Sequence, residues 1–389
     1  MNRLLRTGFD TLLTSVTPIA IWFLLGILVD KNLINIFTLI YPIQFIISSI
    51  KSVFGVGANI SAIRDRTKEN VFSGFLCGAI LGLIILGCII INIDKYINFM
   101  NMESGIYRTF AIYAVAQMFL QLLLNLSLCK LYYENKHKLA NKCSLTFNLI
   151  NFCSLIIMSL ITKNQIQITS ISFVITLIFV LVIVLRTIEK TKFKINIIKC
   201  IRYDSAFLFA EISMFIIYLF GFKNSFDFGE KYILAISFAT LITDTQWDIS
   251  DTIKTVAQID ITKKEFSYSE HLKNSKKLVL GLIVSSIAMG IVLYPIYKVD
   301  IKTTLIVAGI ELISMYIYPI YLTKLTYIQL ERSALKATIH KQISNIIRIM
   351  CSFILSPFCT SIGLVASVIY QLIVTDIIVR KNKINMEMK

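Results

Sequence analysis

The sequence has little charge, few histidines and no CxxC motif. Charged residues make up 16% of the 389 residues, against about 25% in soluble domains, which excludes an ordinary soluble domain. The three histidines have no partner at metal-ligand spacing and are expected in solvated loops, so no metal site is predicted. The eight cysteines fall within or beside apolar stretches, which argues against a disulfide framework. A phosphate-binding loop is also absent, so nucleotide hydrolysis is not indicated.

Long apolar runs take the place of the missing charge. Each run is about 20 residues, the length that an α-helix needs to cross a bilayer. The runs lie at 8–29, 34–60, 71–93, 105–128, 143–162, 166–187, 204–222, 232–258, 277–297, 303–326, 339–357 and 359–379. We therefore predict an all-α, polytopic membrane protein with twelve transmembrane helices.

Positive charge alternates between successive loops. Of the 39 Lys and Arg residues, 28 lie in or beside the even-numbered loops and the two termini, and 8 lie in the odd-numbered loops. Since Lys and Arg mark cytoplasmic loops, both termini are predicted to be cytoplasmic, in a plasma or inner membrane. This asymmetry accounts for most of the net charge of +16, so no nucleic-acid partner is expected.

The two halves of the chain resemble each other. The second run ends in ANISAIRDRTKEN and the eighth in TVAQIDITKKEF. We predict an N-terminal six-helix lobe at 1–187, a cytoplasmic linker at 188–203 and a C-terminal six-helix lobe at 204–389. Because six is an even number, both lobes would enter from the cytoplasm, related by an axis along the membrane normal.

Ionisable residues inside the runs are the candidates for function, because buried charge is costly in lipid and marks substrate or ion paths. Glu211 and Glu311 lie near mid-depth in the seventh and tenth runs. Three aspartates of the eighth run share one helix face at i, i+4 and i+7. We predict cation coupling at Glu211, Asp244, Asp248 and Glu311, and a cargo cavity lined by Asp251, Lys254, Trp247, Lys51, Arg348 and Tyr218.

A structural role is the alternative for part of this set. Asp251 and Lys254 would then form an ion pair, and Arg348 would neutralise a neighbouring helix. The coupling ion stays open between H+ and Na+, with Glu211 as the residue for a sodium ion. No other cofactor is expected.

Two segments resemble the multidrug and toxic compound extrusion (MATE) family, within the multidrug/oligosaccharidyl-lipid/polysaccharide (MOP) exporter superfamily. SVFGVGANISAIRDRTKENVFSG is similar to the family's signature at the end of the second helix. FLFAEISMF resembles the seventh-helix pattern of the NorM-like branch, whose Glu, here Glu211, supplies a cation-site carboxylate. The family's tenth-helix acid has no counterpart at its usual place, and Glu311 lies about two turns earlier.

The resemblance implies a cation-coupled antiporter that exports organic cations, drugs or a related small amphipathic metabolite by alternating access of two lobes. We expect a monomer in the lipid bilayer, and no enzymatic activity. A flippase for a lipid-linked oligosaccharide or polysaccharide precursor is the alternative within the superfamily. A polytopic acyl- or glycosyltransferase is a third possibility, and would need a catalytic cluster at one membrane face.

Overall fold

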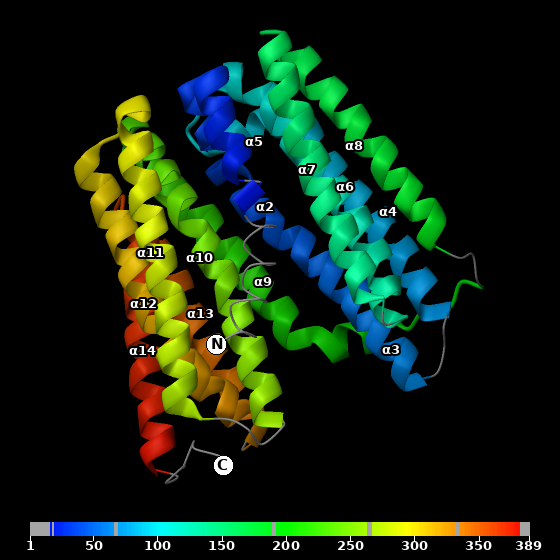
Figure 1. Ribbon diagram of the computed structural model, residues 1–389, viewed down its shortest axis with the longest axis vertical. Helices are drawn as coiled ribbons and strands as arrows, with labels where there is room; N and C mark the ends of the chain where they lie inside the picture. The colour runs from blue at the N-terminus through cyan, green and yellow to red at the C-terminus, as the bar shows by residue number, and fades with distance from the viewer. Residues whose placement is uncertain are drawn as a thin grey trace. The chain divides into compact units, whose positions relative to one another are not determined.

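The computed structural model describes residues 16–17, 19–65, 69–134, 136–188, 192–262, 267–331 and 334–381, and its elements are helices (Figure 1). The first is Ile19–Leu28. In chain order there follow η1 (Lys31–Ile34), α2 (Asn35–Lys51), η2 (Ser52–Gly57), α3 (Ala58–Asp65), α4 (Glu69–Ile91), α5 (Ile93–Phe99), α6 (Ser104–Tyr133), α7 (His137–Ile161), α8 (Gln165–Thr187), α9 (Ile197–Phe226), α10 (Glu230–Thr262), α11 (Tyr268–Tyr297), α12 (Ile301–Glu331), α13 (Ala334–Ser352) and α14 (Cys359–Lys381).

Within the described residues, each of the twelve predicted runs overlaps a helix, so the all-α polytopic fold is confirmed. Within the described ranges, nine helical spans are long and apolar enough to cross a membrane, and the chain is a multi-pass membrane protein. The other three runs match Ile19–Leu28, α10 and α13. α9 begins at Ile197, inside the predicted linker, and α13 ends at Ser352, ahead of Pro357.

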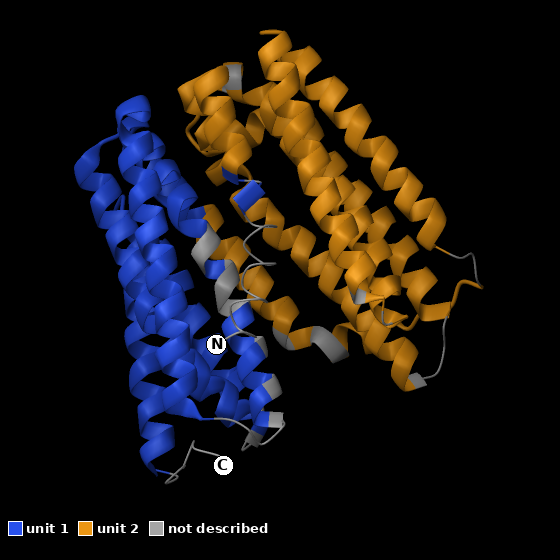
Figure 2. Ribbon diagram, viewed as in Figure 1, with its two compact units in different colours: residues 1–19, 220–389 blue, residues 20–219 orange. Residues whose placement is uncertain are grey.

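The helices form two compact units (Figure 2). Unit 2 comprises residues 20–219, and unit 1 comprises residues 220–389 together with the chain up to residue 19. α9 contributes to both, with residues 197–219 in unit 2 and residues 220–226 in unit 1.

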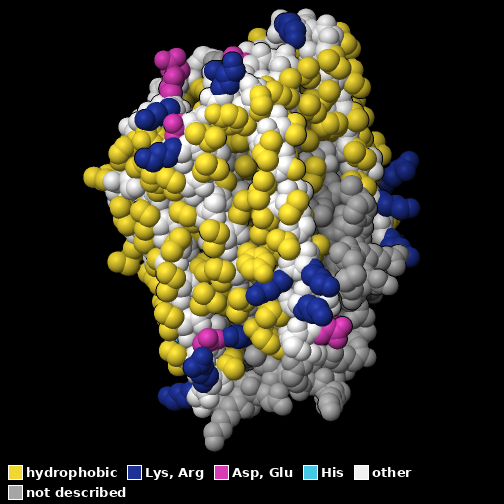
Figure 3. Space-filling model, turned by 60° about the vertical axis from the view of Figure 1, so that its left-hand side comes forward, with side chains coloured by type: hydrophobic (Ala, Val, Ile, Leu, Met, Phe, Trp, Pro, Cys, Tyr) yellow, Lys and Arg dark blue, Asp and Glu magenta, His cyan; other side chains and the backbone are white. Residues whose placement is uncertain are grey.

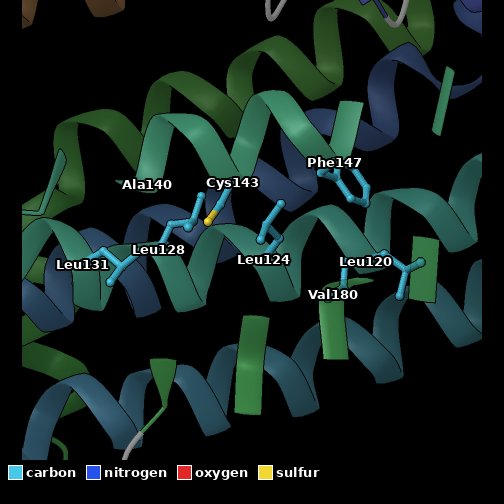
Figure 4. Packing of buried hydrophobic residues seen from close by; sticks show 8 residues of the cluster. All are labelled: Leu120, Leu124, Leu128, Leu131, Ala140, Cys143, Phe147 and Val180. Atoms are coloured by element: carbon cyan, nitrogen blue, oxygen red, sulfur yellow. The ribbon is translucent and has the colours of Figure 1, made fainter. Parts of the chain in front are cut away.

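Leucines of α6 form one of the apolar clusters at the core of unit 2. Leu120, Leu124 and Leu128 recur every four residues on one face of α6 and pack against Phe147 of α7 and Val180 of α8 (Figure 4). This i, i+4 spacing places successive side chains one above the other, so a single stripe of α6 binds two neighbouring helices.

The FGVG segment lies in a π-helical stretch, η2, where backbones approach closely. A Cβ added to Gly57 would lie 2.6 Å from the Cys200 carbonyl oxygen, and one on Gly74 would meet the Phe54 carbonyl oxygen. Only glycine permits such approaches. This segment therefore packs closely against α9 and α4.

In unit 1 the end of α9 docks on the turn between α13 and α14. Asn224 donates a 2.7 Å hydrogen bond to the Ser352 carbonyl, and Cys359 Sγ donates to the Gly221 carbonyl.

The surface of the molecule carries a broad apolar band. In the view of Figure 3, hydrophobic side chains cover most of the visible face, and charged side chains gather toward its two ends. Such a band is what a lipid-facing surface requires.

Candidate functional site

A carboxylate on α12 forms the centre of the polar site in unit 1. Glu311 is half-buried, and its Oε2 is hydrogen-bonded to the hydroxyl of Thr243 on α10. The Thr243 hydroxyl also lies 3.0 Å from the Ala239 carbonyl oxygen, one turn earlier in its own helix. Because α10 and α12 lie side by side, Glu311 of the tenth predicted run lies against Thr243 of the eighth.

Arg348 on α13 supplies positive charge to this site. Its guanidinium acts electrostatically on both the Glu311 carboxylate and the Tyr321 hydroxyl. A cation near a carboxylate offsets part of the cost of placing it among apolar helices. That Arg348 neutralises a neighbouring helix stays a prediction.

Aromatic rings continue the site along α12 and α10. Tyr321 and Tyr318 meet edge to face with ring centroids 5.0 Å apart, and Tyr318 meets Trp247 in the same way at 5.6 Å. We call Thr243, Glu311, Arg348, Tyr318, Tyr321 and Trp247 the unit 1 cluster. The three rings also pack against apolar side chains, among them Leu364 and Val368 of α14.

The structure describes the side chains of only some of the remaining predicted residues of α10. Asp244 and Lys254 are half-buried, and Asp244 directly follows the Thr243 that binds Glu311. Asp248 and Asp251 lie within α10, but their side chains are outside the described residues. The proposed Asp251–Lys254 pair therefore stays a prediction.

Three predicted residues belong to unit 2. Glu211 is half-buried on α9, two residues before the buried Ser213. Tyr218, about two turns after Glu211 on the same helix, stacks on Phe45 with a centroid distance of 5.5 Å, and lies edge to face with Tyr41. Lys51 ends α2, where its charge acts on the Cys129 thiol.

Unit 2 contains a hydrogen-bonded network of polar side chains that was not predicted from the sequence. Gln117 donates to the Tyr113 hydroxyl at 3.0 Å and to the Thr176 hydroxyl at 2.7 Å, and Tyr113 donates to Asn151 Oδ1 at 2.5 Å. These four residues, which we call the neutral network, join α6, α7 and α8. The i, i+4 spacing of Tyr113 and Gln117 within an apolar run is the signal that could have found it.

All three histidines were expected in solvated loops, and for two of them, His271 and His340, that expectation is wrong. His271 is buried in α11, where it bonds the Ile253 backbone and interacts with Asp260. His340 of α13 lies half-buried with Nδ1 3.0 Å from the Tyr370 hydroxyl. His271 lies on a helix that begins earlier than predicted, because α11 extends past its apolar run, and His340 lies just inside the predicted run 339–357. Over the described part of the chain, no group of three or more His, Cys, Asp or Glu could hold a metal ion.

No protein-family model matches the sequence, and no curated protein matches it. Solved structures do match. A multidrug resistance MATE family transporter of the MOP superfamily in an outward-facing conformation is 15% identical, with a TM-score of 0.64 over 98% of this chain and 95% of that one. An inward-facing conformation of such a transporter gives 15% identity and a TM-score of 0.59, covering 95% of this chain and 94% of that one.

A MOP superfamily transporter from Pyrococcus furiosus, described as having a binding pocket of reversed polarity that suggests a different function, gives 14% identity. Its TM-score is 0.64 over 98% of this chain and 96% of that one. These similarities span nearly the whole of both chains, and they concern architecture, since the identities are low. The fold of this chain is therefore that of the MATE transporters of the MOP superfamily.

Proposed function

We propose that the protein is a secondary active exporter of organic cations, drugs or a small amphipathic metabolite, coupled to a proton gradient. The contact between Glu311 and Thr243 carries this proposal. A carboxylate inside a bundle of membrane-crossing helices is costly, so its retention favours a role in transport over a role in packing.

The geometry suits both protonation states of Glu311. A threonine hydroxyl has one proton to donate and two lone pairs to accept with. When Glu311 is ionised, Thr243 donates to it; when Glu311 is protonated, it donates to Thr243, whose own proton then points to the Ala239 carbonyl 3.0 Å away. Proton binding and release therefore require only a hydroxyl rotation, which is what a reversible coupling group needs.

Cargo and proton would exchange because each favours a different state of the transporter. A ligand shifts such an equilibrium only through its difference in affinity for the two states. Glu211 and Asp244, with Asp248, are proposed as further coupling carboxylates, and Glu211 is the residue at which Na+ would replace H+. The aromatic part of the unit 1 cluster would hold the cargo.

The wider setting of the proposal follows the predicted topology. The lobes at 1–187 and 204–389 would alternate in access, with both termini in the cytoplasm, in a plasma or inner membrane and as a monomer. Likeness to both outward-facing and inward-facing MATE transporters supports a fold capable of two such states. Membership of the NorM-like branch stays a prediction.

A flippase for a lipid-linked precursor is the second candidate. The reversed pocket polarity described for the Pyrococcus furiosus transporter indicates that this architecture can hold a differently charged pocket. Lys51, Lys254 and Arg348 are the cations that an anionic pyrophosphate would contact here.

The test is transport of a cationic dye into everted vesicles, driven separately by proton and sodium gradients. Glu311→Gln should lower proton-driven transport at least about tenfold, because the amide cannot exchange a proton. Glu103→Gln, at an exposed position before α6, is the matched control and should keep full activity. Full activity of Glu311→Gln would overturn the coupling role, and dye-independent movement of a lipid-linked precursor would favour the flippase.

A further inference from the structure

We infer that the segment 192–202, between α8 and the membrane-crossing part of α9, lies at the membrane surface and binds anionic phospholipid headgroups. The inference is independent of what the protein transports. It rests on the length of α9, on which face of the segment is packed, and on the charge of the face that is left.

α9 is longer than its crossing. Of its 30 residues, the first six (197–202) include the cations Lys199 and Arg202, and the apolar membrane span lies further along the helix. At about 1.5 Å per residue those six residues extend about 9 Å, enough to pass through a headgroup layer. Asn196 fixes where the helix begins, because its side chain accepts from the Lys199 backbone N–H at 3.1 Å.

One side of the segment is held against unit 2. Cys200 is fully buried in a cluster with Val53 and Ala58. Its carbonyl oxygen lies so close to Gly57 that an added Cβ there would be 2.6 Å away. The Lys194 backbone N–H donates to Ser73 Oγ at 2.7 Å. The segment is therefore anchored at a fixed place on its own unit, so the exposed residues form a defined surface.

The outward side of the segment is apolar and basic at once. Ile197, Ile198 and Ile201 are 43%, 79% and 40% exposed, and Phe193 is 62% exposed. At 100° per residue the three isoleucines share one exposed sector of the helix, next to the sector of Lys199 and Arg202. Lys192 and Lys194 add two exposed cations, and residues 192–202 contain no acid.

This combination identifies the partner by its chemistry. An apolar sector beside a cationic one is what an interfacial helix needs, since the side chains enter the acyl boundary while the charges meet lipid phosphates. Basic residues next to a membrane-crossing helix are drawn to anionic lipids. A soluble protein partner would explain the cations, but not exposed isoleucines placed directly beside the hydrocarbon layer.

The experiment uses the full chain reconstituted in phosphatidylcholine vesicles with and without phosphatidylglycerol. The variant Lys192→Gln/Lys194→Gln/Lys199→Gln/Arg202→Gln should lower the enrichment of co-purifying phosphatidylglycerol over phosphatidylcholine at least about tenfold. The matched control, Lys138→Gln/Lys142→Gln/Lys273→Gln/Lys277→Gln, removes four exposed cations from the same predicted side. Equal enrichment in both variants would overturn the proposal.

A second variant keeps the proposal testable if the first one fails to fold. Ile198→Trp keeps every charge, and brominated phosphatidylglycerol should quench its added fluorescence more than brominated phosphatidylcholine does. Absence of quenching by either lipid would place the segment in water and overturn the inference. Protection of the new tryptophan by a soluble protein partner, without lipid quenching, would count against it equally.

Discussion

Two polar groups, one in each unit, differ in kind. In unit 1 the cluster on α10, α12 and α13 contains a carboxylate and a guanidinium, Glu311 and Arg348. In unit 2 the network on α6, α7 and α8 contains only hydroxyls and amides. Groups that ionise can change state when a proton binds, whereas neutral hydrogen bonds chiefly fix helices in place. We therefore assign switching to the unit 1 cluster and rigidity to the neutral network.

The largest expected effect comes from removing the cation of unit 1. At a pH that keeps Glu311 ionised, Arg348→Gln should lower the free energy of unfolding by up to about 3 kcal/mol, because the carboxylate loses a nearby positive charge. Adding Glu311→Gln should restore most of that loss. Thermal unfolding of the single and double variants in detergent measures the coupling; purely additive losses would show that the two groups do not interact.

The next largest effect on stability is expected in unit 2, from a glycine that packs against the backbone of another helix. Gly57→Ala places a Cβ 2.6 Å from the Cys200 carbonyl oxygen, so the helices must separate at a cost of about 2 kcal/mol. Gly87→Ala is the control, since no atom lies within 4 Å of its new Cβ and helix propensity then favours alanine by up to about 1 kcal/mol. Similar melting temperatures of the two variants would argue against a rigid unit 2.

The neutral network should matter less, and only for stability. Thr176→Val removes the hydroxyl that accepts from Gln117, which costs about 1 kcal/mol, the size found for such bonds in membrane proteins. Its gradient-driven transport should stay near that of the unchanged protein. A transport defect as large as that of Glu311→Gln would erase the distinction between the two units.

The smallest effect is expected from an ion pair at the end of α6. Glu134 accepts from Lys136 at 2.7 Å and lies 3.4 Å from Lys130, and the hydrogen bond from Lys136 is the main reason that its pKa is lowered. A carboxyl with a lowered pKa stabilises the fold above its unfolded value of about 4.3, and that stability is lost as the pH falls through the lowered pKa.

We expect Glu134 to contribute about a few tenths of a kcal/mol to the free energy of unfolding, because its partner Lys136 is well exposed to solvent. Glu134→Gln should therefore lower the melting temperature slightly near about pH 7 and not near about pH 3. A difference that persists at the lower pH would assign the effect to something other than the charge.

The sequence predicted the helices well and the sites in part. Apolar runs of about 20 residues predicted all nine membrane spans found among the described residues, since lipid demands that the backbone satisfy its own hydrogen bonds. The same patterns misplaced helix ends: α9 begins early, at Ile197, because helices continue past the apolar layer into polar residues, whereas α13 stops short at Ser352, ahead of Pro357. Glu311 and Arg348 were singled out as costly charges, but not as interacting groups.

Sequence alone determined that the chain crosses a membrane many times and that charges stand within apolar helices. Only the tertiary structure decided which groups meet: Thr243 with Glu311 and Tyr113 with Asn151. Hydropathy and helical period are properties of a local stretch of chain. The partner of a side chain depends on how helices far apart in sequence rotate and pack, and no local pattern specifies that.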